Sequence, residues 1–143
     1  IERITHSKEV IAYTDVECCS GAYWLASQCS EIYCTGSARL GSIGVYSVFE
    51  DRTKELEREG VKLNMISAGE MKLAGAYFKP MTDAERAMFQ ARVDKIYGQF
   101  TGAVTRTRGL ASEQMQGQVF DGEDSVKYNL ADAVIDDMES LIR

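Results

Sequence analysis

The 143-residue sequence contains a single histidine, and this scarcity excludes several kinds of active site. A metal site built from clustered histidines is excluded, and a Ser–His–Asp triad would have to use His6. His6 lies at the very start of the chain, where a surface role is the simpler interpretation. The sequence therefore does not favour catalysis by a histidine base.

The sequence also lacks an excess of basic residues and any long apolar run. The sequence has 16 Lys and Arg residues and 22 Asp and Glu residues, which gives a net charge of −6. A nucleic-acid-binding face would need basic residues to neutralise phosphates, so we expect no nucleic-acid partner. No run approaches the roughly 18 apolar residues of a membrane span, and the start does not resemble a signal peptide. We expect membrane contact only through an anchor upstream of this chain.

Phosphate-binding and metal-binding motifs are also missing. The segment "GSIG" has neither the Walker lysine nor the G-x-G-x-x-G pattern, and the cysteines lack the C-x-x-C spacing of a zinc site. We expect no metal and no cofactor. The four cysteines lie in one short stretch, and we expect them to be buried, reduced thiols: Cys18, Cys19, Cys29 and Cys34.

Strands and helices are predicted to alternate along the chain. We expect strands at 9–15, 31–36, 61–69 and 133–135, and helices at 20–29, 48–60 and 82–108, with two short helices and a terminal helix in the tail. Loops are expected at 37–47 and 70–81. Thr82 and Glu85 form a capping box at the start of the longest helix. The alternation favours an α/β fold with a parallel sheet and crossover helices.

One ordinary domain suits this length and a hydrophobic content of 45%. There is no internal repeat and no low-complexity linker, so residues 1–143 form one domain or part of one. The chain opens at Ile1 and runs almost at once into a predicted strand. We therefore expect it to be a piece of a longer protein.

A hydroxyl nucleophile with a lysine base is the chemistry that the residue types still allow. An exposed lysine has a pKa near 10.4, so only about one in 2,500 is neutral at pH 7. A lysine base therefore needs burial or positive neighbours. Most lysines lie on charged helices, whereas Lys72 lies between Met71 and Leu73 in "AGEMKLAGA". A loop lysine without catalytic role and a carboxylate-pair hydrolase remain the open alternatives.

Ser20 is the candidate nucleophile in "ECCSGAYWLASQC", where it follows a predicted strand and precedes a predicted helix. A serine in this place is usually only an N-cap. The same place puts its hydroxyl at a helix N-terminus, where the dipole and the N–H groups favour a developing oxyanion.

Four blocks of sequence, in this order, resemble the signal peptide peptidase (SppA-type) serine proteases over nearly the whole chain. They are "CSGAYWLASQCSEIYCTGSARLGSIGV" (19–45), "ISAGEMKLAG" (66–75), "MTDAERAMFQARVDKIYGQFTGAVTRTRGLASEQ" (81–114) and "GQVFDGEDSVKYNLADAV" (117–134). This sequence departs from the family pattern at three positions: glycine is usual in place of Ala22, alanine in place of Ser125 and glycine in place of Asn129. Asparagine still tolerates the left-handed conformation that ends a helix.

This resemblance implies a crotonase/Clp-protease-like fold and a Ser–Lys dyad. Residues 1–143 would be the C-terminal part of a single SppA-type peptidase domain whose N-terminal part is missing. Ser20 matches the nucleophile and Lys72 the general base, the Gly21 N–H would be an oxyanion donor, and Ser42 would orient the lysine. The rest of the oxyanion hole would come from a glycine pair upstream.

The implied function is a serine endopeptidase acting on a peptide or protein substrate, with two branches open. One cleaves signal-peptide remnants at a bacterial membrane, and the other is a phage-encoded cytoplasmic relative that cleaves scaffold and head proteins. The resemblance also implies a homo-oligomer, with the long helix and the C-terminal segment as candidate contacts. The alternatives are a crotonase-fold acyl-CoA enzyme and a catalytically inactive assembly scaffold.

Overall fold

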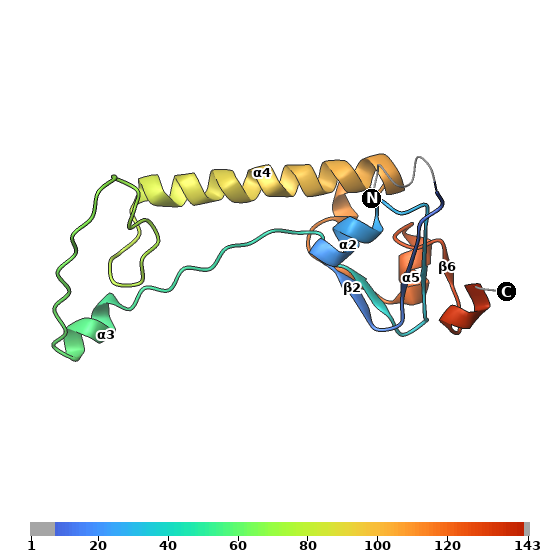
Figure 1. The fold of residues 1–143 in the computed structure, drawn as a ribbon, viewed down its shortest axis with the longest axis horizontal. Helices are drawn as coiled ribbons and strands as arrows, with labels where there is room; N and C mark the ends of the chain where they lie inside the picture. The colour runs from blue at the N-terminus through green and yellow to red at the C-terminus, as the bar shows by residue number, and fades with distance from the viewer. Residues whose placement is uncertain (1–7, 142–143) are drawn as a thin grey trace. The chain divides into compact units, whose positions relative to one another are not determined.

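The computed structural model describes residues 8–141, and the chain divides into two compact units. The first unit comprises Ile1–Val45 and Ile96–Arg143, and the second comprises Tyr46–Lys95. The positions of the two units relative to each other are not determined (Figure 1). His6 lies outside the described residues.

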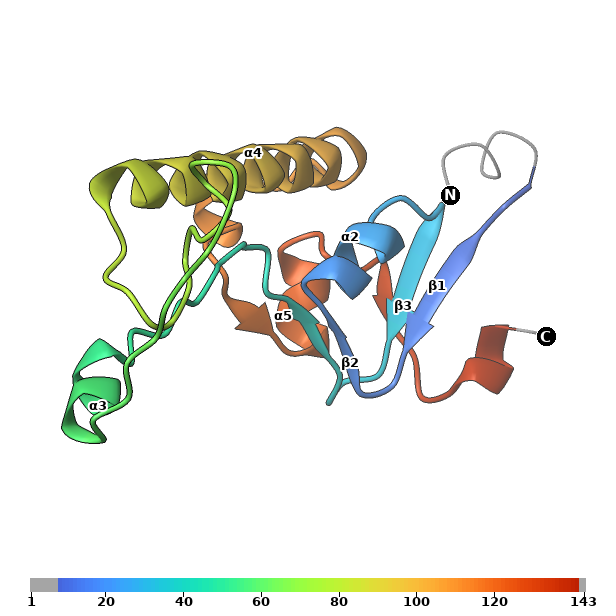
Figure 2. The same ribbon diagram turned by 60° about the vertical axis from the view of Figure 1, so that its left-hand side comes forward.

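Two small sheets, each of three strands, form the framework of the first unit. In the first sheet β3 lies between two parallel neighbours, and β1 and β3 run side by side in Figure 2. In the second sheet β4 pairs in parallel with β2 and antiparallel with β5. The strands are β1 (Ile11–Thr14), β2 (Glu17–Cys19), β3 (Glu31–Cys34), β4 (Arg39–Gly41), β5 (Val119–Phe120) and β6 (Ala133–Val134).

Short helices connect these strands, and one long helix crosses the boundary between the units. Figure 1 shows α2 directly after β2. No helix among residues 8–141 is long and apolar enough to cross a membrane. The helices are α2 (Gly21–Ala26), α3 (Thr53–Arg58), α4 (Asp83–Arg108), η1 (Ser112–Gln114), α5 (Gly122–Lys127) and η2 (Met138–Leu141).

The hydrophobic core lies entirely in the first unit. Tyr23 of α2 is fully buried, and its hydroxyl donates to the carbonyl of Leu130 at 3.0 Å. Trp24 stacks on Phe100 of α4 with ring centroids 4.8 Å apart. Each fully buried large side chain of this kind stabilises the fold by about 1.5–3 kcal/mol. The core therefore holds the start of α2 firmly against the sheets and the C-terminal half of α4.

An ion pair between a buried arginine and an exposed aspartate anchors the C-terminal end of α4. The Arg108 guanidinium, which is almost fully buried, donates to both carboxylate oxygens of Asp132 at 2.9 and 3.1 Å. One of these oxygens also accepts the backbone N–H of Ile32 in β3 at 2.7 Å. Asn129, with φ 67, ends the turn after α5 in the left-handed conformation, as the sequence predicts.

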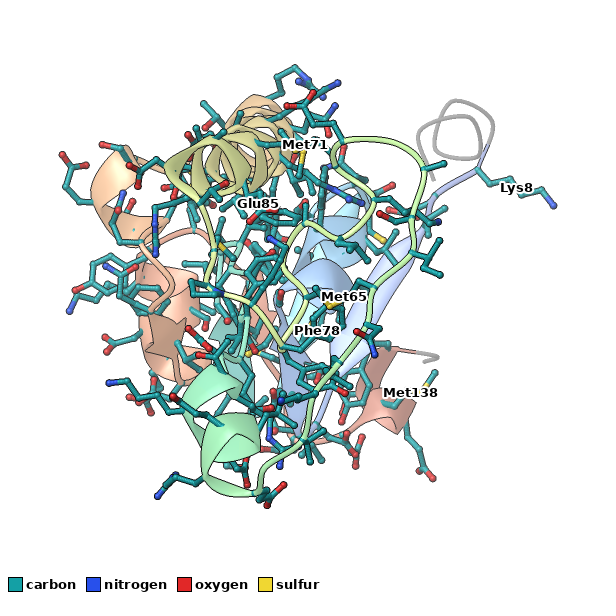
Figure 3. All side chains as sticks on the ribbon, turned by 90° about the vertical axis from the view of Figure 1, so that its left-hand side faces the viewer. Lys8, Met65, Met71, Phe78, Glu85 and Met138 are labelled. Atoms are coloured by element: carbon teal, nitrogen blue, oxygen red, sulfur yellow. The ribbon has the colours of Figure 1, made fainter. Side chains whose placement is uncertain are left out.

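The second unit has almost no core of its own. Every fully buried apolar residue among residues 8–141 lies outside it, whereas Ile66 is 100% exposed and Val48 80% exposed. A groove of about 310 Å³ lies between α3 and the segment that follows it; Met65 and Phe78, labelled in Figure 3, both line it. Apolar side chains that line an open groove remain largely in contact with water, so this unit contributes little hydrophobic stabilisation.

Two reciprocal hydrogen bonds between Thr82 and Glu85 hold the start of α4. The Thr82 hydroxyl accepts the Glu85 N–H at 3.2 Å, and the Glu85 carboxylate accepts the Thr82 N–H at 3.0 Å. Glu85, labelled in Figure 3, also pairs with Lys79 at 2.5 Å. Together these contacts hold the pKa of the Glu85 carboxyl below its usual value, the Lys79 bond first. The capping box predicted from the sequence is confirmed.

Most predicted elements are confirmed, some with shorter bounds. The strand predicted at 61–69 is wrong: Val61 bonds back to Leu56, and the segment beyond it has no strand partner among residues 8–141. The loop predicted at 37–47 contains β4, and β2 and β5 were not predicted. These strands are only two or three residues long, too short for an alternating pattern to indicate them.

Candidate active site at the end of strand β2

Ser20 lies between β2 and α2, in a backbone conformation that serine rarely adopts. Its φ is 55° and its ψ is −123°. Its N–H donates to the Gly41 carbonyl at 2.8 Å, and its carbonyl accepts the Trp24 N–H at 2.9 Å. Strained backbone of this kind costs roughly 1–3 kcal/mol and persists only where the surroundings hold it. The two backbone bonds supply that hold.

The Ser20 side chain does not cap the helix. It is exposed, and its hydroxyl forms no hydrogen bond with any of residues 8–141. The usual role of a serine at this place is thus not the role that the structure shows. The sharp turn from strand to helix presents the hydroxyl to solvent, as a nucleophile requires.

Gly21 begins α2 next to the Ser20 hydroxyl. The first turn of a helix leaves its N–H groups without an intrahelical acceptor. Gly21 is exposed, and a Cβ added there would meet nothing within 4 Å. Its N–H is therefore accessible to an oxygen atom bound beside Ser20.

Ser42 lies close to Ser20 through the backbone of Gly41. Gly41 accepts the Ser20 N–H, and Ser42, the next residue, donates its own N–H to the Gln118 carbonyl at 2.6 Å. Ser42 also has a positive φ, of 50°. The structure thus brings Ser20, Gly21 and Ser42 together in the first unit.

Lys72 lies in a turn of the second unit, and its distance from Ser20 is not determined. Its N–H donates to the Gly69 carbonyl at 3.1 Å, and its side chain is exposed. Met71 is 43% exposed, so the apolar surroundings expected for a lysine base are not supplied by the second unit alone. Burial of this amine would need a further surface over the turn.

Lys79 is the other lysine of the second unit that has an unusual environment. Its amine contacts the nearly buried Glu85 carboxylate at 2.5 Å. Lys79 is thus engaged in an ion pair at the start of α4. Lys72 stays the candidate base of this unit.

The cysteines beside Ser20 are poor nucleophiles. Burial raises the pKa of the Cys18 thiol to about 11, and neighbouring thiols add to the shift. Burial also raises the pKa of Cys19. A thiol reacts as its thiolate, so these raised pKa values lower the reactivity of both cysteines near neutral pH. All four cysteines are free, but only Cys34 is fully buried, so their predicted burial is correct only in part.

Two supporting residues were missed from the sequence. Gly41 has a φ of 113°, and a Cβ added there would lie 2.7 Å from the Gln118 carbonyl oxygen. Gly41 therefore has to be glycine both for its conformation and for this close approach. A glycine directly before a candidate orienting serine was the available signal for Gly41. Nothing in the sequence indicated Gln118.

The strand, the strained serine and the helix behind it form the candidate site, and comparison with known proteins gives the family. The model of "Peptidase family S49" matches residues 2–141, so this chain belongs to peptidase family S49. The match covers both units.

Curated relatives of the chain include phage and bacterial proteins. The chain is 31% identical to the "Head-tail preconnector protein GP5" of Enterobacteria phage P21 and covers 29% of it, with 99% of this chain aligned. It is 28% identical to the "Capsid assembly protease C" of Escherichia phage lambda, with 99% of this chain and 33% of that protein aligned. It is 28% identical to "Protease 4" of Haemophilus influenzae, with 89% and 21% aligned. The chain thus spans a third or less of these relatives.

Proposed function

We propose that this chain carries the catalytic dyad of a serine endopeptidase, with Ser20 as nucleophile and Lys72 as general base. The observation that carries the proposal is the Ser20 hydroxyl, which is exposed and does not cap α2, on a strained turn at the start of this helix. Membership of a peptidase family supports it, as does the lowered reactivity of the neighbouring thiols.

The proposed reaction begins when the Ser20 Oγ attacks the peptide carbonyl carbon. The neutral Lys72 amine takes the hydroxyl proton, and the Gly21 N–H donates to the carbonyl oxygen as it becomes negative. The carbon–nitrogen bond then breaks, and the Lys72 ammonium gives its proton to the leaving amine. Water, deprotonated by Lys72, hydrolyses the acyl-enzyme and frees Ser20.

Ser42 is proposed to orient the Lys72 amine through its hydroxyl. This role requires an apolar surface over the amine, which its own unit does not supply. We also propose the crotonase/Clp-like arrangement for the complete domain, with the remaining oxyanion donors supplied from outside this chain.

We propose phage scaffold or head proteins as the substrates. Two of the relatives carry names that refer to capsid assembly and to a head-tail preconnector. The competing substrate is the signal-peptide remnant, the second branch of the resemblance. We further propose that the active protein is a homo-oligomer, because the second unit exposes many apolar side chains.

The test is hydrolysis of an unfolded reporter protein by matched serine variants. Ser20→Ala should abolish cleavage, whereas Ser37→Ala, which removes another exposed hydroxyl of the first unit, should leave the rate unchanged. Circular dichroism should show both variants folded. Cleavage by Ser20→Ala at the parent rate would place the nucleophile elsewhere, and a parent that stays inactive in the complete domain would favour the inactive scaffold.

A further inference from the structure

The backbone of Ser20 is held by a chain of contacts that begins outside the residues of the proposed dyad. The Ser20 N–H donates to the Gly41 carbonyl at 2.8 Å, and the next residue, Ser42, donates its N–H to the Gln118 carbonyl at 2.6 Å. The same Gln118 oxygen approaches Gly41 so closely that a Cβ there would lie 2.7 Å from it. One carbonyl thus fixes both residues that support the nucleophile.

This contact extends the pairing of β4 with β5. Gly41 pairs with Val119 on β5 and with Cys19 on β2. Beyond the strand ends, Ser42 lies opposite Gln118, and the Gly117 N–H donates to the Ile43 carbonyl at 3.0 Å. The placement of the Gln118 carbonyl therefore determines where the backbone of Ser42 is held.

The Gln118 side chain makes two hydrogen bonds to the backbone of the loop that precedes it. Its Oε1 accepts the Gln116 N–H at 2.8 Å, and its Nε2 donates to the Glu113 carbonyl at 2.7 Å. These bonds tie residues 113–118 into one closed loop on the side of β5 nearest to Ser42. Without them the loop has fewer constraints on the Gln118 carbonyl.

We propose that Gln118 is a positioning residue for the nucleophile, acting through Ser42 and Gly41 on the backbone of Ser20. The inference rests on the proposed function, in which Ser20 is the nucleophile. Gln118 touches no reacting atom. It holds Ser20 in a conformation that the isolated backbone disfavours, because φ is positive at Ser20, Gly41 and Ser42 alike.

The test compares two glutamines of the same loop. Gln118→Met keeps the length of the side chain and removes both of its bonds. Gln116→Met is the matched control: its Nε2 donates to the Ser112 carbonyl at 2.8 Å and to the Tyr97 hydroxyl at 3.3 Å, but its side chain makes no bond to Gln118. Gln118→Glu keeps the acceptor for the Gln116 N–H and should restore part of the loss.

The first readout is labelling of Ser20 by a small fluorophosphonate, at a temperature where all variants are folded. Gln118→Met should lower the maximal labelling rate by about tenfold or more, since a misplacement on the order of 1 Å can cost about 100-fold. The half-saturating probe concentration should not change. Gln116→Met should label like the parent. Equal labelling by Gln118→Met and parent, or an equal loss in Gln116→Met, would overturn the inference.

The second readout does not depend on activity. Amide hydrogen exchange should be faster at Ser20 and Ser42 in Gln118→Met and unchanged there in Gln116→Met. If the parent is not labelled at Ser20, the proposed nucleophile is wrong, yet this exchange still decides whether Gln118 holds that backbone. Unchanged exchange at both serines in Gln118→Met would overturn the positioning role by itself.

Discussion

At the scale of single residues, backbone strain is concentrated beside the candidate nucleophile. The residues other than glycine with positive φ among residues 8–141 are Ser20, Ser42 and Asn129. Asparagine tolerates this conformation at a helix end, whereas serine gains nothing from it. Ser20 is bonded to the Gly41 carbonyl and Ser42 is the next residue after Gly41, so both strained serines lie in the candidate site.

Ser20→Gly should be more stable than Ser20→Ala. Neither variant has a hydroxyl, so the comparison isolates the backbone. Glycine relieves the positive φ at Ser20, and we expect its free energy of unfolding to be higher by roughly 1 kcal/mol. Urea denaturation of both variants measures this difference. A Ser20→Gly variant less stable than Ser20→Ala would show that the turn is not strained.

The sequence could suggest candidate site residues but not their conformation. Ser20, Gly21 and Ser42 were expected by resemblance, and the structure brings them together. The positive φ of Ser20 and the role of Gln118 depend on backbone contacts between segments far apart in the chain, which no local pattern encodes. The apolar setting expected around Lys72 is absent within its own unit, where its side chain is exposed.

At the scale of elements, the sequence predicted correctly those elements whose hydrogen bonds join residues close together in the chain. The capping box at Thr82 and Glu85 and the long helix α4 were predicted because their determinants lie within a few residues. The strand predicted at 61–69 has the right alternation, but a strand also needs a partner. Val61, Leu63 and Met65 line the groove beside α3 instead.

Glu85→Gln should destabilise the start of α4 in a pH-dependent way. The folded-state pKa of Glu85 lies below its usual value of 4.5, so its stabilisation is present above pH 4.5 and is lost as the pH falls through the folded value. Amide exchange over the first two turns of α4 should be faster in Glu85→Gln than in the parent at pH 7, and the difference should shrink as the pH falls through the folded-state pKa of Glu85. Asp83→Asn, an exposed first-turn control, should change exchange less. A difference that persists in acid would contradict the role assigned to the carboxylate.

At the scale of the whole molecule, exposed apolar surface is distributed unevenly. The second unit exposes Tyr46, Val48 and Ile66 almost completely, while the core of the first unit is closed. A soluble protein rarely leaves such surface uncovered. The uneven distribution supports the proposed assembly.

Ile66→Asp should weaken self-association without lowering the stability of the free chain, because Ile66 is 100% exposed. Sedimentation velocity over a range of concentrations should show a larger species for the parent and a smaller one for the variant. Met138→Asp, which alters an exposed apolar residue of the C-terminal segment, is the control. A parent that is monomeric at every concentration would contradict the assembly, and a loss in Met138→Asp alone would move the contact to the C-terminal segment.

The central claim, a serine nucleophile activated by Lys72, is tested most directly by the pH dependence of kcat/KM for the parent and Lys72→Arg. Parent activity should rise with pH, because only the neutral amine can accept the proton of the serine hydroxyl. Lys72→Arg should be inactive throughout, because a guanidinium keeps its proton at pH values where an amine loses it. Lys62→Arg, at another exposed lysine of the same unit, should retain the parent profile. A Lys72→Arg variant with near-parent activity would contradict the Ser–Lys mechanism.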